Sequence, residues 1–187
     1  MTTTISRSPS QLIATLRGLY FARFAFALVW ALILIATKPQ VGPLLTALVV
    51  IYPLVDAGAV FWQLRSEGRA SAPRVSETIN VVVSVIVAIA LGVASTMSLG
   101  AALGVWGVWA ALSGLAQLVT AVQRRKAGGQ VPQMLSGGIS VLAGLSFLAQ
   151  SLQGADNIAS VGGYAILGGI FFLVSAIRLS VVLRKTA

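Results

Sequence analysis

Few side chains in this sequence can carry out acid–base or metal chemistry. The chain has no histidine and no cysteine, which excludes disulfides, thiolate nucleophiles and histidine-based catalytic triads. A Walker-type phosphate loop is also absent, because no glycine is followed by lysine. We therefore expect a protein that is not an enzyme and that has no cofactor and no metal ion. Its four carboxylates are Asp56, Glu67, Glu77 and Asp156.

Two ionisable side chains, Arg23 and Asp56, lie within long apolar runs rather than between them. Charged groups inside a bilayer are costly, and by default they indicate a functional site. If the chain turns near residue 40, both residues reach nearly the same depth on two antiparallel helices, because each is about equally far from the turn. We therefore predict an Arg23–Asp56 ion pair within the first hairpin, which lowers the cost of both charges in lipid. Two interpretations of its role stay open: the pair is structural, or Asp56 binds a proton or a cation.

Neutral polar residues take the corresponding positions in the next part of the chain. Asn80 and Ser113 lie equally far from a second turn near residue 97. We therefore expect them to form a secondary polar pair between the third and fourth helices. Gln117 and Ser140 are further polar side chains inside apolar runs.

The composition indicates which elements position these residues. Hydrophobic residues make up 57% of the chain and charged residues 9%, with a mean hydropathy of +0.94. A soluble domain has about 45–50% apolar and about 25% charged residues. The apolar runs lack the period-two alternation of a β-barrel and are long enough for membrane helices. The sequence predicts an all-α polytopic membrane protein, with transmembrane helices at about 17–37, 43–64, 77–95, 99–122, 134–151 and 159–180.

Basic residues are concentrated in every second connection. Of the 13 Lys and Arg, all but Arg23 and Lys38 lie near the two termini or in the connections after the second and fourth helices. By the positive-inside rule, these segments face the cytoplasm, so both termini are predicted to be cytoplasmic. The basic residues form short clusters rather than one continuous face, so the net charge of +9 does not indicate a nucleic-acid partner. The expected partner is the lipid bilayer, and a homo-oligomer stays open.

Short and long connections alternate, so the six helices form three helical hairpins, at about 16–66, 76–124 and 133–182. We expect these hairpins to make one transmembrane domain, 16–187, preceded by a flexible tail, 1–15. The hairpins look like an internal repeat. The second helix of each carries an aromatic, a small, two aliphatic, a variable and a small residue in succession. This motif is found at 52–57, 109–114 and 164–169.

These motifs resemble the HdeD-like proteins, a family of small bacterial inner-membrane proteins built from three such hairpins. The family motif commonly reads Tyr-Ala-Leu-Val-Asp-Gly. Tyr52 and Asp56 match it, Ala57 stands at the glycine position, and Pro53 departs from it. The resemblance implies a multi-pass protein of the bacterial inner (plasma) membrane. It also implies a role in envelope stress or acid tolerance, because some members are linked to acid resistance, although most are known only as domains of unknown function.

Small residues line one face of the fourth predicted helix. Spacings of three and four residues place them in a stripe, and such stripes allow membrane helices to approach closely. Packing within the bundle, homodimerisation and the lining of a substrate path are all open. A shorter stripe on the sixth helix (Gly162, Ala165 and Gly169) predicts that the fourth and sixth helices pack together. The first stripe comprises Gly100, Gly104, Gly107, Ala111 and Gly114.

The sequence thus predicts a non-enzymatic membrane protein of the HdeD-like type. The alternative is a small transporter or channel subunit in which Asp56 binds a proton or a cation. A membrane-embedded enzyme would need Glu77 or Asp156 within hydrogen-bonding reach of Asp56. A polar cavity that reaches Asp56 would favour transport or sensing, whereas a sealed core would favour a scaffold.

Overall fold

The computed structural model of the chain describes residues 9–66, 75–123 and 131–186. Within these ranges the chain forms six α-helices and no strand. All six are long and apolar enough to cross a membrane, which confirms the predicted all-α fold. The helices are α1 (Pro9–Thr37), α2 (Pro43–Ser66), α3 (Val75–Met97), α4 (Leu99–Gln123), α5 (Val131–Leu152) and α6 (Ala159–Thr186).

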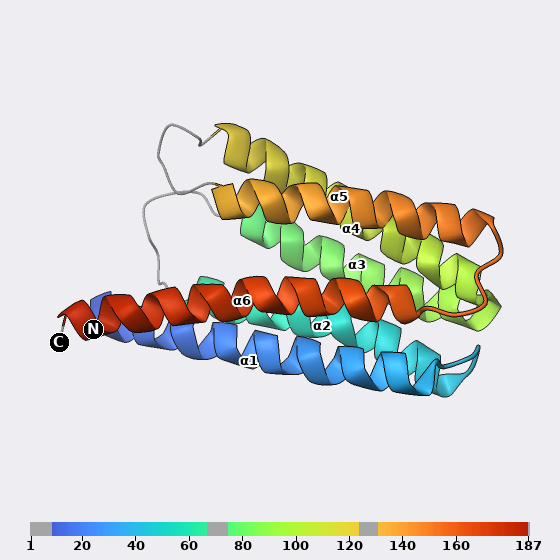
Figure 1. Cartoon of the computed structure of the whole chain (residues 1–187), viewed down its shortest axis with the longest axis horizontal. Coiled ribbons are helices and arrows are strands. Elements are labelled where there is room, and N and C mark those ends of the chain that lie inside the picture. The colour runs from blue at the N-terminus through green and yellow to red at the C-terminus, as the bar shows by residue number, and fades with distance from the viewer. Residues whose placement is uncertain (1–8, 67–74, 124–130, 187) are drawn as a thin grey trace, which may run out of the picture.

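The six helices run along one long axis, with three short turns at one end (Figure 1). We call this end the short-turn end and the opposite end the long-loop end. The turns join α1 to α2, α3 to α4 and α5 to α6, so the chain forms three successive hairpins as predicted. The start of α1 and the end of α6 both lie at the long-loop end (Figure 1). Because α1 begins at Pro9, it extends into the segment 1–15 that the sequence assigns to a tail.

Local sequence explains where helices start and stop at the short turns. Pro43 is the first residue of α2, a position at which its missing N–H leaves no helical hydrogen bond unmade. Ser98 separates α3 from α4, and its Oγ accepts a hydrogen bond from the backbone N–H of Ala101 at 2.9 Å, as an N-cap does. Gly154, just after α5, has a φ of +78°, in the left-handed region that glycine adopts at low cost.

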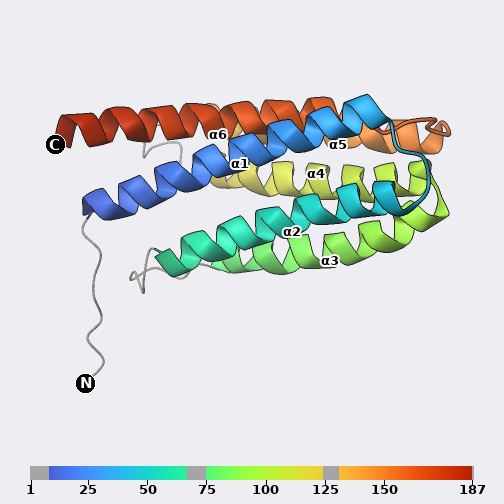
Figure 2. The ribbon, with the colours of Figure 1, turned by 90° about the horizontal axis from the view of Figure 1, so that it is seen from below.

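The most extensive helix packing occurs between the hairpins rather than within them. α4 packs against α5, α1 against α6, and α2 against α3, whereas the two helices of one hairpin share fewer contacts. Figure 2 shows α1 alongside α6 and α2 alongside α3. The first and last helices are therefore neighbours, and the bundle consists of three close-packed helix pairs.

The small-residue stripe of α4 lies against α5. A Cβ atom added to Gly107 would come within 2.8 Å of the Gly144 carbonyl oxygen, and one added to Gly114 within 2.7 Å of the Gly137 carbonyl oxygen. The two backbones are thus close enough that no side chain fits between them. This is packing within the bundle. Gly100 and Gly104, in the same stripe, face Ser151 of α5, and Ala111 faces Gly144.

The predicted packing of the fourth helix against the sixth is wrong. The shorter stripe on α6 lies against α1 instead, since a Cβ atom on Gly162 would come within 3.2 Å of the Ala31 carbonyl oxygen. The physical reason is that α5 carries its own glycines, Gly137 and Gly144. They are spaced like Gly107 and Gly114 of α4, so these two helices approach each other most closely.

The hydrophobic core is concentrated at the short-turn end. The C-terminal parts of α1, α3 and α5 and the N-terminal parts of α2, α4 and α6 meet there. Their inward-facing apolar side chains are buried, whereas those on the outside of the bundle are exposed. The largest such side chain is Trp106. The others with no exposed surface include Leu34, Leu45, Val49, Leu91, Leu103, Ile158 and Val161.

Candidate functional site: a polar cavity between the six helices

Arg23 of α1 and Asp56 of α2 form an ion pair in which Nη2 of Arg23 donates to Oδ1 of Asp56. Their side chains are 14% and 21% exposed, so they are neither sealed in the core nor free in solvent. The guanidinium carbon of Arg23 also lies 3.9 Å from the ring centroid of Phe172 in α6, a cation–π contact. Both partners lie at the same level because α1 and α2 are antiparallel and joined by a short turn.

The second carboxylate oxygen of Asp56 faces α3. Asn80 Nδ2 donates to Oδ2 of Asp56 at 3.3 Å, and the buried Ser84 hydroxyl donates to the same oxygen at 3.5 Å. Both oxygens of Asp56 are thus engaged. Three helices meet at this single carboxylate.

The expected partner of Asn80 was Ser113, and the structure places Asn80 against Asp56 instead. Among the described residues no hydrogen bond joins Asn80 to Ser113. The reason is the pairing of the helices, because α3 packs mainly on α2 whereas α4 packs mainly on α5. Asn80 and Ser113 nevertheless line the same cavity.

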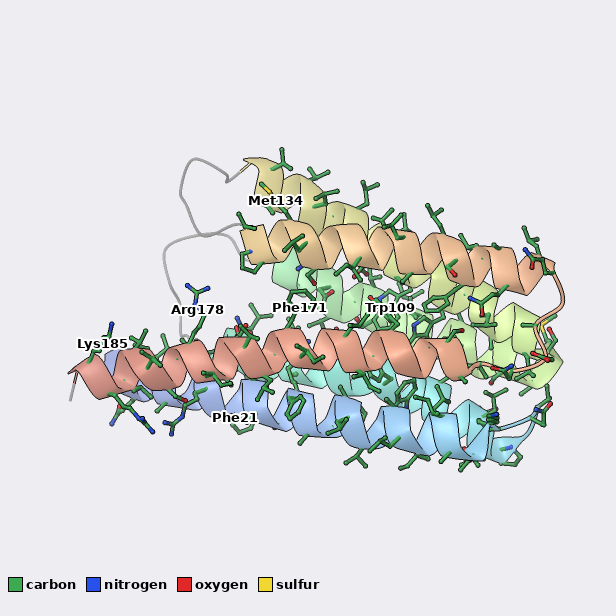
Figure 3. All side chains as sticks on the ribbon, in the orientation of Figure 1. Phe21, Trp109, Met134, Phe171, Arg178 and Lys185 are labelled. Carbon is green, nitrogen blue, oxygen red and sulfur yellow. The ribbon has the colours of Figure 1, made fainter. Side chains whose placement is uncertain are left out.

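That cavity has a volume of about 410 Å³ and is bounded by all six helices. It extends from Asp56 to the long-loop end, where the exposed Pro132 at the start of α5 forms part of its rim. Two of its lining residues, Trp109 and Phe171, are labelled in Figure 3 near the middle of the bundle. Its polar lining consists of Tyr20, Arg23, Tyr52, Asp56, Gln63, Asn80, Trp109, Ser113, Gln117, Ser136, Ser140, Tyr164 and Ser175.

Aromatic side chains close the inner end of the cavity. Trp106 stacks on Trp30 with ring centroids 5.5 Å apart, and it meets Trp109 edge-on at 5.4 Å. Tyr52 packs against Trp106 at 5.4 Å. Trp30 is fixed by a 2.8 Å hydrogen bond from its Nε1 to the Leu48 carbonyl oxygen. Beyond this aromatic layer lies the apolar core of the short-turn end, so the cavity stops there.

Two indole N–H groups of this layer are unpaired. The Nε1 atoms of Trp106 and Trp109 are buried and have no hydrogen-bond partner in the described part of the chain. An indole nitrogen can only donate, and a buried donor without an acceptor is costly. Other atoms of the Trp109 ring line the cavity, whereas its Nε1 has no accessible surface.

Opposite the ion pair, the hydroxyl of Tyr164 in α6 lies 3.0 Å from the hydroxyl of Ser140 in α5. Ser140 was flagged from the sequence as a polar residue in an apolar run, and Tyr164 begins the third repeat of the motif. Sequence reasoning missed Ser84 and Phe172. Ser84 had a signal, because it lies four residues after Asn80 and so shares its helix face.

The other carboxylates do not approach this site in the described ranges. Asp156 lies in the turn between α5 and α6 at the short-turn end, where it accepts a 2.7 Å hydrogen bond from Asn157. Glu67 and the side chain of Glu77 lie outside the described part of the structure. No cluster of three potential metal ligands occurs among the described residues.

Residues 79–149 match the family described as "Short repeat of unknown function (DUF308)". The matched segment covers most of α3, all of α4 and most of α5. It includes Asn80, Trp109 and the glycine contact between α4 and α5, but neither Arg23 nor Asp56. No curated protein and no solved structure matches the chain. Together with the six apolar helices, this similarity indicates a multi-pass membrane protein with an internal repeat.

Proposed function

We propose that the chain is a small transporter in which Asp56 binds a proton or a cation at the inner end of a one-sided cavity. The observation that supports this most strongly is the cavity itself. It reaches the Arg23–Asp56 pair from the long-loop end and stops at the aromatic layer. A scaffold has no need of a polar cavity around an intramembrane ion pair, and a channel would need a passage through both ends.

The three helix pairs supply the moving parts of this proposal. Arg23 belongs to the α1–α6 pair and Asp56 to the α2–α3 pair, so their ion pair joins two separate units. The Tyr164–Ser140 hydrogen bond joins α6 to α5 in the same way. A proton or cation on Asp56 weakens its attraction for Arg23. The α1–α6 pair is then free to shift against its neighbours, which opens the opposite end.

Orientation and setting are part of the same proposal. By the distribution of Lys and Arg, the long-loop end faces the cytoplasm, so the cavity is open to the cytoplasm. The HdeD-like resemblance supports a place in the bacterial inner membrane and a role in envelope stress or acid tolerance. Reporter fusions after Arg69, Lys126 and Ala187 should give cytoplasmic signals, and fusions at Gln40 and Asp156 periplasmic ones.

The proposal is that of a non-enzymatic protein. Along the described lining of the cavity, Asp56 is the single carboxylate, and Arg23, Asn80 and Ser84 hold its two oxygens. General acid–base catalysis on a substrate would require a titratable group free to reach it.

Flux into proteoliposomes tests the proposal. Vesicles containing the full chain and internal dyes for pH and for sodium are placed in an outward-acidic gradient. Potassium with valinomycin clamps the voltage, and sodium, chloride and benzenesulfonate are present as co-ions. We expect proton or sodium entry with the unaltered chain and with Asp156→Asn, and loss of entry with Asp56→Asn. Asp156→Asn is the matched control because it makes the same change at the short-turn end. Tight vesicles with the unaltered chain, or equal entry with Asp56→Asn, would refute transport through Asp56.

A further inference from the structure

The guanidinium of Arg23 offers the cavity hydrogen-bond donors that call for an anionic ligand. Arg23 carries five N–H donors and no acceptor, and in the structure its Nη2 donates to Asp56. The Arg23 side chain lines the cavity together with the ring of Trp109, whose Nε1 is itself enclosed.

Of the two species proposed for Asp56, a proton reaches it more readily than a cation does in this arrangement. Arg23 occupies one of its oxygens, and Asn80 and Ser84 occupy the other. A cation would have to displace a guanidinium that is also held over the ring of Phe172. A proton has no such difficulty, because it adds to an oxygen without needing room.

We propose that the cavity binds a small organic monoanion on Arg23 together with a proton on Asp56. The charge balance requires the two to bind jointly. Arg23 and ionised Asp56 sum to zero, so an anion alone would leave an uncompensated negative charge in a membrane cavity. When a proton adds to Asp56, the ion pair with Arg23 is replaced by a pair between Arg23 and the anion, and the site is neutral again.

The groups around Asp56 fit this exchange. From α1, Asp56 is faced by the charged side chain of Arg23, and from α3 by the neutral donors Asn80 and Ser84. The lining also includes Tyr52 of α2 and Tyr164 of α6. On α4 and α5 the lining residues are not ionisable. Protonation of Asp56 is therefore the change that frees Arg23.

The residues that line the cavity indicate the size and the polarity of the anion's non-charged part. Aromatic rings of Tyr20, Trp109, Phe171 and Phe172 line the cavity, and Phe172 contacts Arg23 directly. Its volume of about 410 Å³ lies within the roughly 300–1,000 Å³ of small-molecule sites. A carboxylate or sulfonate with a compact apolar or aromatic body matches both features.

The inference rests on the proposed transport function, but its test measures binding in detergent and therefore fails independently of flux. Benzenesulfonate is titrated calorimetrically into the purified full chain from about pH 8 to about pH 5.5, a range over which an ordinary carboxyl group is largely ionised. This probe stays anionic throughout, so any pH dependence belongs to the protein. We expect its affinity to rise as the pH falls, by up to about tenfold per pH unit, the limit for one coupled proton.

Variants assign this behaviour to residues. Asp56→Asn should bind tightly at about pH 8 and lose the pH dependence, whereas Asp156→Asn should behave like the unaltered chain. Arg23→Gln should not bind. If Asp56→Asn does not fold, the pH series on the unaltered chain still decides the coupling.

Related probes give the outcomes that would overturn the inference. Benzenesulfonamide is the neutral counterpart of the probe and should not bind. Binding of benzylammonium that disappears in Asp56→Asn would make the cavity a cation site. Binding of phenylalanine that is independent of pH and needs both charged residues would make it a zwitterion site. Cation flux through liposomes without any binding of the sulfonate would leave transport standing and refute the anion.

Discussion

The short-turn half and the long-loop half of the bundle are made of the same six helices, yet one is solid and the other is hollow. In the short-turn half, Trp30, Trp106 and a group of aliphatic side chains form a buried core between the helices. In the long-loop half, the inward positions carry serines, glutamines and Gly168, and a cavity is left between them. The difference lies in side-chain volume and polarity, since the helices continue through both halves.

The comparison teaches where stability and function are separated in this fold. Apolar contact in the sealed half holds the helices together, and this allows the polar residues of the hollow half to stay accessible. Asp56 and Tyr52 belong to the same repeat motif, and they lie at the boundary, where the aromatic layer meets the cavity. Substitutions in the sealed half should therefore mainly change stability, whereas substitutions in the hollow half should mainly change the accessible polar site.

The largest loss of stability is expected from Trp106→Ala. Trp106 has no exposed surface, so its truncation leaves a large void and should cost about 3–5 kcal/mol. Unfolding in detergent, followed by circular dichroism, measures the loss. Trp62→Ala is the matched control, because Trp62 is 58% exposed on the outside of α2 and should change stability by only about 0.5 kcal/mol. Similar losses for the two variants would contradict a solid short-turn half.

The ion pair at the boundary should come next. Asp56→Asn and Arg23→Gln each leave one charge without its partner, and each should destabilise the protein by roughly 2–3 kcal/mol. Both side chains are partly exposed, so the expected loss is intermediate. Removing one partner of a fully buried ion pair costs about 3–5 kcal/mol, and an exposed ion pair contributes at most about 1 kcal/mol. The double variant should lose less than the sum of the two. Strictly additive losses would show that the two charges are not coupled.

A methyl group distinguishes close-packed from open backbone. In Gly144→Ala the new Cβ would lie 2.5 Å from the Ala111 backbone nitrogen, so α4 and α5 must separate, at a cost of about 1–3 kcal/mol. Gly168→Ala places the same methyl group on the cavity wall, where nothing lies within 4 Å. That control should gain up to about 1 kcal/mol from helix propensity. Equal melting temperatures for the two variants would argue against the close approach of α4 and α5.

The smallest effect on the fold is expected from single cysteine substitutions. They measure whether a polar reagent can reach the substituted position. The chain has no cysteine of its own, so each introduced thiol is read without background. Ser136→Cys, in the cavity lining, should react with a polar thiosulfonate in detergent, whereas Ser95→Cys, with no exposed surface in the sealed half, should not. Mass spectrometry of the labelled chain gives the extent of reaction. Equal labelling of both would remove the distinction between the two halves.

The six helices and three hairpins could be predicted because the length and spacing of apolar runs determine them. The contact between Arg23 and Asp56 followed from depth alone, since a short turn places residues equally far from it at one level. Whether this pair acts in transport stays a prediction. The location of Asn80 against Asp56 did not follow, because depth does not say which helix is the neighbour.

Helix partners and cavities depend on all surfaces at once, which explains what was missed. The stripe on α4 correctly indicated close packing, but its partner was assigned to α6. The matching spacing of Gly137 and Gly144 on α5 was the overlooked signal. The cavity itself could not be derived, because a void is defined by the side chains that fail to fill it.

The contact between the first and last helices has a consequence for how the protein is made. α1 packs mainly against α6, and α6 is produced after the other five helices of the bundle. At about 5–20 residues per second, α1 waits on the order of ten seconds in the membrane before its main partner emerges. During that interval its bond to α2 through Arg23 and Asp56 is available, because both residues are made early. The ion pair that lines the finished cavity would then hold α1 against α2 during biosynthesis, until α6 is present.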